Sequence, residues 1–197
     1  MPRLPKINAE QAVSAAQGLF WKYGYQGLGT RKLEDETGIT RFSLQTNHGG
    51  KKTLFLKTLD AYCEYFETEF LPKTGDDPLE NLAAWFEARA NPELAPESGR
   101  YGCLMLNCAV EFQGQDEEVN LRTTRFTQVF QNSFRLILKS AIESQSLAKH
   151  FDVESNVRIL HGLALSLNVV IRAAENNAAG IPLAKATAKM IRAWKTD

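Results

Sequence analysis

Cysteines are scarce in this sequence, and long apolar runs and a net charge are missing. The three cysteines, Cys63, Cys103 and Cys108, form neither a CxxC pair nor a cluster with metal-ligand spacing, so we expect no metal site and mostly buried thiols. No apolar run approaches the ~20 residues that span a bilayer, and the first residues lack the apolar stretch of a signal peptide. The sequence therefore predicts a cytoplasmic protein that does not enter a membrane.

Catalytic motifs are missing as well. The histidines, His48, His150 and His161, have no Cys or Ser partner at a catalytic spacing. The sequence also lacks a glycine-rich phosphate loop and an identifiable pair of carboxylates. An enzyme is therefore the least favoured class of function, and we expect no cofactor.

Charge is distributed unevenly along the chain although the formal net charge is zero. Residues 1–60 carry nine Lys or Arg against five Asp or Glu, whereas residues 61–197 carry 14 against 18. A basic first part followed by an acidic body is typical of a protein in which only the first part meets phosphates. The asymmetry favours a nucleic-acid contact near the N-terminus.

Apolar residues recur with helical spacing along the whole chain, and no stretch alternates as a strand would. With 44% hydrophobic residues the chain can bury a sizeable core. We expect an all-α fold with a helix-turn-helix domain at 1–50 and a helical ligand-binding and dimerisation domain at 51–197. About nine helices are predicted, at residues 8–23, 30–37, 40–47, 51–71, 78–90, 101–112, 116–145, 153–176 and 182–194.

Two of these helices are short and adjacent, and a turn at Gly38 joins them. A pair of short helices with a glycine in the turn, packed on a preceding helix, is a helix-turn-helix. We expect Leu33 and Leu44 to face inward and Thr40 to cap the second helix. Helical hairpins that bind no DNA show the same pattern. The outward side chains of the second helix can all reach base edges, and they are Arg41, Phe42, Gln45, Thr46 and Asn47.

Four stretches in a fixed order resemble the DNA-binding domain of the TetR family of repressors. They are Ala16–Phe20, Gly24–Tyr25, Leu33–Leu44 and Gly49–Phe55, and together they cover about residues 8–60. The second half of the chain resembles the variable ligand-binding body of that family in length and number of helices. Within it, Gly102–Asn107 is similar to a glycine-cysteine stretch found in some subgroups.

The resemblance assigns roles to individual residues. It implies that Thr30 and Arg31 open the first motif helix at the phosphate backbone and that Lys51 holds a phosphate. It places Arg41, Phe42, Ser43, Gln45, Thr46 and Asn47 on the helix that reads the bases. The chain departs from the family where Gln45 replaces a usual Tyr, Asn47 a usual aromatic residue and His48 a usual Phe.

A single helix-turn-helix contacts too few bases for high specificity, so such proteins bind pseudo-palindromes as dimers with half-sites ~34 Å, or a multiple of it, apart. The resemblance implies that the last two helices form the dimer interface. Alternatively, their apolar faces bury only against their own chain. The residues expected at the interface are Leu160, Leu163, Leu167, Val170, Ile171 and Met190.

Aromatic and sulfur side chains recur in the body, where they could line an apolar cavity for a small effector. Alternatively, they form an ordinary core. Cys103 follows Gly102 at the start of a helix, so it is also a candidate for a thiol that reacts with electrophiles. The residues expected to contact an effector are Tyr62, Phe66, Trp85, Cys103, Asn107, Phe126 and Phe130.

These expectations combine into one function. The sequence predicts a regulator that binds double-stranded operator DNA as a homodimer, represses transcription and is released by a small apolar or electrophilic molecule. The alternative is a helical adaptor that kept this fold and lost specific DNA binding, as the departures at Gln45, Asn47 and His48 suggest.

Overall fold

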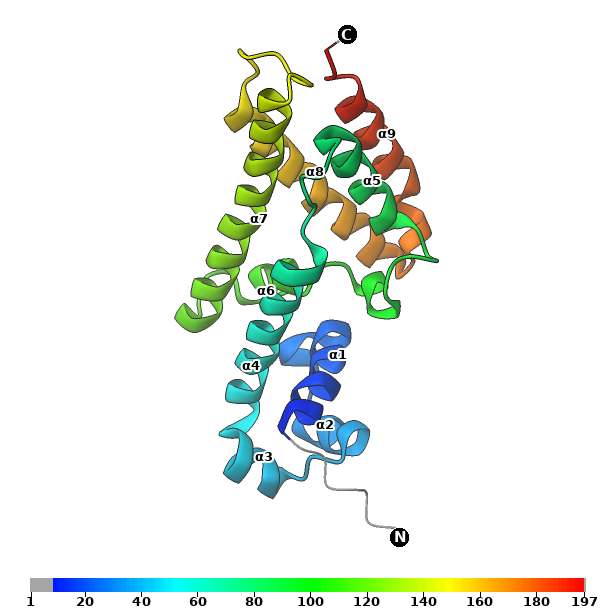
Figure 1. The fold of residues 1–197 in the computed structure, drawn as a ribbon. Coiled ribbons are helices and arrows are strands. Elements are labelled where there is room, and N and C mark those ends of the chain that lie inside the picture. Colours follow the sequence, from blue (N-terminus) through cyan, green and yellow to red (C-terminus); the bar gives the residue numbers. More distant parts are fainter. Residues whose placement is uncertain (1–8, 197) are drawn as a thin grey trace. The chain divides into compact units, whose positions relative to one another are not determined.

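The computed structural model describes residues 9–196, and within this range it contains nine α-helices and no strand (Figure 1). Short π- or 3₁₀-helical turns occur at Phe66–Phe70, Glu97–Tyr101 and Asn177–Gly180. The prediction of an all-α fold is confirmed. The helices are α1 (Ala9–Gly27), α2 (Thr30–Thr37), α3 (Arg41–His48), α4 (Gly50–Tyr65), α5 (Pro78–Ala90), α6 (Leu104–Phe112), α7 (Glu117–Glu143), α8 (Val153–Ala174) and α9 (Ile181–Arg192).

Most helices begin and end near the residues predicted from the sequence, and two of them differ. The helix expected from residue 101 begins at Leu104, because Glu97–Tyr101 form a separate 3₁₀ turn and Gly102 takes a φ of 72°. The helix expected to end before Gly24 has a kink there and continues to Gly27. Asn8, the residue expected to cap this helix, lies outside the described residues.

The chain forms two compact units, which we call unit 1 (residues 1–68 and 104–124) and unit 2 (residues 69–103 and 125–197). These units do not follow the expected division between residues 50 and 51. The reason is that α4 and α6 both pack against α1, so they join the helix-turn-helix in unit 1. The unit that contains the helix-turn-helix is therefore built from more of the chain than its first 50 residues.

Aromatic rings make the centre of unit 1. Phe55 of α4 lies 4.9 Å from Phe20 and 4.9 Å from Tyr25, measured between ring centroids. Phe112 of α6 stacks on Phe55 at 5.7 Å. Edge-to-face and offset stacking of this kind adds to the burial of the rings. The cluster ties α1, α4 and α6 together behind the two short helices.

Unit 2 has an aromatic centre of its own. Phe134 of α7 is fully buried, and its ring lies 4.8 Å from Phe130 and 6.1 Å from Phe86. Trp85 packs edge-on against Phe130 at 5.6 Å, and its indole N–H donates to the carbonyl of Phe70 at 2.7 Å. The indole is therefore held by both its ring and its polar edge.

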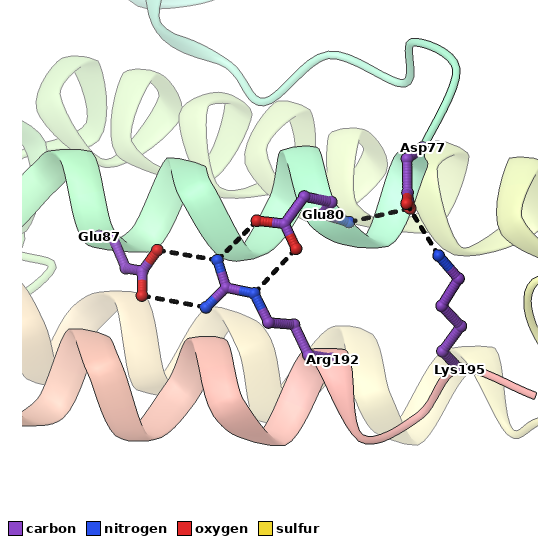
Figure 2. Close-up of polar contacts among 5 residues, drawn as sticks. All are labelled: Asp77, Glu80, Glu87, Arg192 and Lys195. Atoms are coloured by element: carbon purple, nitrogen blue, oxygen red, sulfur yellow. Dashed lines mark hydrogen bonds and ion pairs between the residues drawn. The ribbon is translucent and has the colours of Figure 1, made fainter.

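The C-terminal helix is fastened to α5 by a two-pronged ion pair (Figure 2). The guanidinium of Arg192 donates to both oxygens of Glu80, at 2.8 and 2.6 Å, and to both oxygens of Glu87, at 3.0 and 2.9 Å. Next to it, Asp77 accepts from Lys195 at 2.9 Å and caps α5 by accepting from the Glu80 N–H at 3.2 Å. Bidentate geometry makes such pairs more directional than single surface ion pairs.

Helix α8 is unusually apolar. By length and composition it could cross a membrane, since an 18-residue window has a mean hydropathy of 1.4, whereas the sequence predicts no such segment. Only 28% of that window is buried. The buried positions recur every three or four residues, as on the core side of an amphipathic helix, and are Val157, Leu160, Ala164, Leu167 and Ile171. Three large apolar residues of α8, Ile159, Val169 and Val170, lie exposed.

We expect Arg192→Ala to lower the free energy of unfolding by about 1 kcal/mol, at the upper end for exposed pairs, because two carboxylates lose their partner. Hydrogen bonds from Arg192 lower the pKa of Glu80 and of Glu87. The pair therefore stabilises the fold above the unfolded pKa of 4.5, and this contribution is lost as the pH falls through the lowered values.

Urea unfolding at pH 7 and at pH 3 measures the effect of Arg192→Ala. Lys189→Ala, which removes a charge from the exposed side of the same helix, is the control. The variant and the control should differ at pH 7 and converge at pH 3. An Arg192→Ala protein as stable as the control at pH 7 would contradict the assignment.

Candidate DNA-binding site

The turn between α2 and α3 is fixed by its own hydrogen bonds. Gly38 takes a φ of 73°, in the left-handed region that favours glycine, and its N–H donates to the carbonyl of Glu34. The hydroxyl of Thr37 donates to the carbonyl of Leu33 and accepts from the N–H of Ile39 at 3.1 Å. The glycine turn expected here is confirmed, and it holds the two helices at a set angle.

Helix α3 is capped at both ends. At its start, the hydroxyl of Thr40 accepts from the N–H of Ser43 at 3.1 Å, which confirms the expected cap. At its end, Gly49 takes a φ of 72° and its N–H donates to the carbonyl of Leu44. Leu44 and His48 are buried on the inner side. The caps and the buried side fix which face of α3 points outward.

The outward face of α3 carries the side chains that were expected to read bases. Phe42 is a large apolar residue, and it is 78% exposed. Two hydrogen bonds order the face: Thr46 donates to the carbonyl of Phe42 at 2.9 Å, and the Asn47 amide donates to the half-buried Ser43 at 3.0 Å. The exposed residues are Arg41, Phe42, Gln45, Thr46 and Asn47.

The start of α2 presents the two residues that were expected to meet phosphates. Arg31 is exposed, and the nearest carboxylate oxygen, on Asp35, lies 4.0 Å from its Nε, so the pair is weak. Thr30 is half-buried at the first position of the helix. Backbone N–H groups at such a helix start can bind a phosphate oxygen.

Lys51, which is expected to hold a phosphate, makes a contact inside unit 1. Its side chain is half-buried, its ammonium donates to the carbonyl of Tyr25, and it lies 4.2 Å from the centroid of the Tyr25 ring. Burial lowers the pKa of Lys51, and the charge of Glu111 acts against that shift. The ammonium already has an acceptor inside unit 1, so a phosphate would have to share it.

Glu111 of α6 is a residue that the sequence did not single out. Its carboxylate accepts from the N–H of Tyr25 at 3.0 Å and from the N–H of Gln26 at 2.6 Å. Gly24 takes a φ of 72°, and a Cβ there would lie 2.9 Å from a carboxylate oxygen of Glu111. A glycine at residue 24 signals a bend, but nothing local indicates an acid 87 residues further on.

Comparison with known proteins places this chain in a family. Residues 78–189 match the family model described as the C-terminal domain of tetracycline repressor-like proteins, which is more than half of the chain. The chain belongs to the TetR family of transcriptional regulators. The expected resemblance and the expectation of a DNA-binding regulator are confirmed at the level of the family.

Named relatives of the chain are transcriptional regulators. The HTH-type transcriptional regulator YezE of Bacillus subtilis (strain 168) is 24% identical over 178 residues, which cover 87% of this chain and 90% of that protein. The HTH-type transcriptional repressor BdcR of Escherichia coli (strain K12) is 31% identical over 111 residues, 54% of this chain and 55% of BdcR. The chain thus spans about half the length of BdcR in this match.

Solved structures share the fold over nearly the whole chain. A TetR-family regulator from Cytophaga hutchinsonii superimposes with a TM-score of 0.81 at 16% identity, over 98% of this chain and 100% of that one. CifR, solved as a cysteine variant with a 26-base-pair operator DNA, has a TM-score of 0.71 at 18% identity, with 98% and 100% covered. At these identities the likeness concerns the fold alone.

His48 occupies a position where the TetR family usually has Phe. Its ring is buried behind α3, and burial, aided by the charge of Lys57, lowers the pKa of His48. The His48 ring therefore takes a buried place behind α3, and the lowered pKa disfavours its charged form.

The residues expected to contact an effector are divided between the units. Tyr62, Phe66 and Asn107 belong to unit 1, and the remaining four, Trp85, Cys103, Phe126 and Phe130, belong to unit 2. The expected effector contacts therefore stay a prediction.

All three cysteines are buried. Among residues 9–196 no group of three His, Cys, Asp or Glu is arranged to hold a metal ion.

The residues expected at a dimer interface also fall into two groups. Leu160, Leu167 and Ile171 are at most 2% exposed within their own chain, so they have no surface to offer a partner. This part of the prediction is corrected, because the core side of α8 was taken for its outer side. Leu163 and Met190 are half-buried, and Val170 is 38% exposed.

We expect the stability of the wild-type protein to fall as the pH drops below 6.5, the unfolded pKa of histidine. Since the pKa of His48 is lowered in the folded state, the unfolded chain binds the proton more readily, and the fold loses up to about 1.4 kcal/mol per pH unit. His48→Phe should flatten this slope, and the remainder comes from His161, whose pKa burial also lowers. His150→Phe, at an exposed position, is the control.

Urea midpoints at pH 7.5, 6.5 and 5.5 measure the slopes of the three proteins. The account predicts equal slopes for wild type and His150→Phe and a flatter one for His48→Phe. Identical slopes in all three would show that His48 is not buried as a neutral ring.

Proposed function

We propose that this chain is a ligand-responsive transcriptional repressor that binds a pseudo-palindromic operator as a homodimer. The observation that carries the proposal is the outer face of α3. This helix is capped by Thr40 and ended by Gly49, and it exposes five side chains that can all contact bases. Membership in the TetR family supports the same function.

The chemistry of the outer face suits the major groove of DNA. Arg41 can pair with guanine, and the amides of Gln45 and Asn47 can pair with adenine. Phe42, which is largely exposed, supplies an apolar contact for a thymine methyl group. Arg31 and the start of α2 supply backbone contacts that set the position without reading sequence.

We place the dimer interface on the exposed side of α8. Ile159 and Val169 are 48% and 55% exposed, and Val170 lies beside them. Exposed apolar residues along one helix form a stripe that suits an interaction surface. A second copy of the same helix would cover it across a two-fold axis, which is how most homodimers are arranged. Leu163 and Met190, which are half-buried, border the same part of unit 2.

We infer that the effector is a small apolar or electrophilic molecule. In unit 2, Trp85, Phe70 and Leu71 line an open pocket, and apolar aromatic walls are typical of pockets for such compounds. Cys103 is buried, so an electrophile would have to enter the protein to reach its thiol. Of two fold neighbours, NemR of E. coli is described as a reduced form and CifR as a cysteine mutant. The regulator acts in the cytoplasm, needs no catalytic group and is not an enzyme.

A helical adaptor remains the second candidate. The specific observation in its favour is that Lys51, the residue expected to hold a phosphate, donates to Tyr25 instead. Lys52, its neighbour, is likewise paired with Asp116. A protein that had lost DNA binding would have no use for the exposed face of α3, and this face decides between the two candidates.

Selection of duplexes from a random pool by the full-length protein should enrich an inverted repeat. On the enriched duplex, Arg41→Ala should bind about tenfold more weakly and lose its preference at one base pair of each half-site, because one bidentate base contact is gone. Fluorescence anisotropy at near-physiological salt measures both effects. Lys139→Ala, which removes an exposed charge of unit 2, should bind as wild type does. A pool without any consensus would favour the adaptor.

We expect Val169→Glu to convert the dimer to a monomer, because two charges would meet across the two-fold axis without a partner. Sedimentation velocity at micromolar concentration measures the mass. Leu94→Glu places the same charge on a residue of unit 2 that is 68% exposed and away from α8, and this control should stay dimeric. A wild-type monomer, or a dimer that survives Val169→Glu, would contradict the proposed interface.

A further inference from the structure

The peptide units at Tyr25 are held from two sides by charged groups. On one side, the carboxylate of Glu111 accepts from the N–H groups of Tyr25 and Gln26, at 3.0 and 2.6 Å. On the other, the ammonium of Lys51 donates to the carbonyl of Tyr25 and lies over its ring. We call this three-residue contact of Glu111, Tyr25 and Lys51 the Tyr25 bridge.

The Tyr25 bridge joins both ends of the helix-turn-helix. Tyr25 lies in the last turn of α1, five residues before α2 begins at Thr30. Lys51 lies at the start of α4, three residues after α3 ends at His48. The chain therefore enters and leaves the pair of reading helices at one point, and a side chain from α6 fastens that point.

The hydrogen bonds of the Tyr25 bridge to Glu111 depend on the kink at Gly24. The N–H groups of Tyr25 and Gln26 can turn toward α6 because the backbone bends at Gly24, where φ is 72° and ψ is 174°. Glu111 fills the space beside this glycine, since a Cβ there would lie 2.9 Å from its oxygen. The ring of Tyr25 is fixed as well, at 4.9 Å from Phe55 and 5.4 Å from Phe112.

We propose that Glu111 is a positioning residue for sequence-specific DNA reading, a role that rests on the proposed function. Its carboxylate sets the path of the chain into α2 and, through Tyr25 and Lys51, the start of α4 behind α3. The residue lies in α6, outside the stretch 8–60 that the family resemblance assigns to DNA binding. A base-reading helix displaced by an ångström loses contacts that depend on direction, whereas phosphate contacts tolerate the shift.

The direction in which DNA affinity changes when Glu111 is neutralised distinguishes a positioning role from charge repulsion alone. An acidic residue in a DNA-binding unit repels phosphates, so its neutralisation should by itself strengthen binding to any duplex. If Glu111 positions the reading helices, its neutralisation should weaken binding to the selected sequence instead. Only one oxygen of a glutamine could accept at Tyr25 and Gln26, and its NH₂ group would face the other N–H.

The test compares Glu111→Gln with Glu64→Gln in the full-length protein. Both variants lose one negative charge in unit 1, and Glu64 is exposed on α4. Affinities are measured by fluorescence anisotropy for the duplex selected by the wild type and for a scrambled duplex of equal length. Glu111→Gln should bind the selected duplex about tenfold more weakly and the scrambled duplex at least as tightly as wild type. Glu64→Gln should lose affinity for neither.

Three results would overturn the inference. Glu111→Gln could match Glu64→Gln on both duplexes, which would leave Glu111 without a role in reading. It could lose affinity equally for both duplexes together with a lower melting temperature, which would indicate general destabilisation. A wild-type protein that does not distinguish the duplexes would refute the proposed function, and this wild-type measurement is independent of the variants.

A double-mutant cycle with Lys51→Met tests whether the bridge acts as a unit. Since Glu111 and Lys51 both act through Tyr25, the double variant should bind the selected duplex about as weakly as the weaker single variant. Additive losses would show that Lys51 acts on the DNA independently and would contradict the bridge.

Discussion

The kink at Gly24 imposes a constraint on which the rest of the DNA-reading unit depends. A backbone that bends inside a helix leaves N–H groups without their helical partners, and each such group costs about 1–3 kcal/mol if it is buried unsatisfied. Glu111 accepts from two of these groups, at Tyr25 and Gln26. Because the acceptor comes from α6, the helix-turn-helix cannot take its position from α1 alone. The ring cluster around Phe55 packs on the same backbone segment that Glu111 holds.

The parts of the fold that could be predicted from the sequence are those decided within a few residues. Gly38 and Gly49 take left-handed conformations and Thr40 caps α3, so both short helices are fixed by local hydrogen bonds. The exposed face of α3 follows from the same caps. These features need no knowledge of distant residues, and prediction succeeded there.

Prediction was weaker wherever a distant partner decides the outcome. The acceptor for the N–H of Tyr25 is Glu111, which lies 86 residues away in the chain, and no local sequence pattern predicts it. Lys51 has the position of a phosphate ligand in the sequence, but its ammonium turns inward because a carbonyl and a ring are within reach. On α8, apolar residues surround much of the helix, so periodicity could not distinguish Leu160 and Ile171, which are buried, from Val169, which is exposed.

The two units are therefore stabilised by different kinds of contact. In unit 1, the N–H groups of Tyr25 and Gln26 at a kink are bonded by Glu111, and caps at both ends fix the reading face of α3. In unit 2, α9 is fastened to α5 by the fork of Arg192, while α8 keeps an apolar stripe exposed. A rigid reading face and an apolar stripe are the two requirements of a regulator that binds two half-sites as a dimer.

Hydroxyl-radical footprinting of the full-length protein on its selected duplex tests this account most directly. Two identical reading faces joined by a dimer must approach the DNA from one side. The account predicts two symmetric protected stretches whose centres lie about one helical turn, or a whole multiple of it, apart. A single protected stretch, or uniform protection without symmetry, would contradict it.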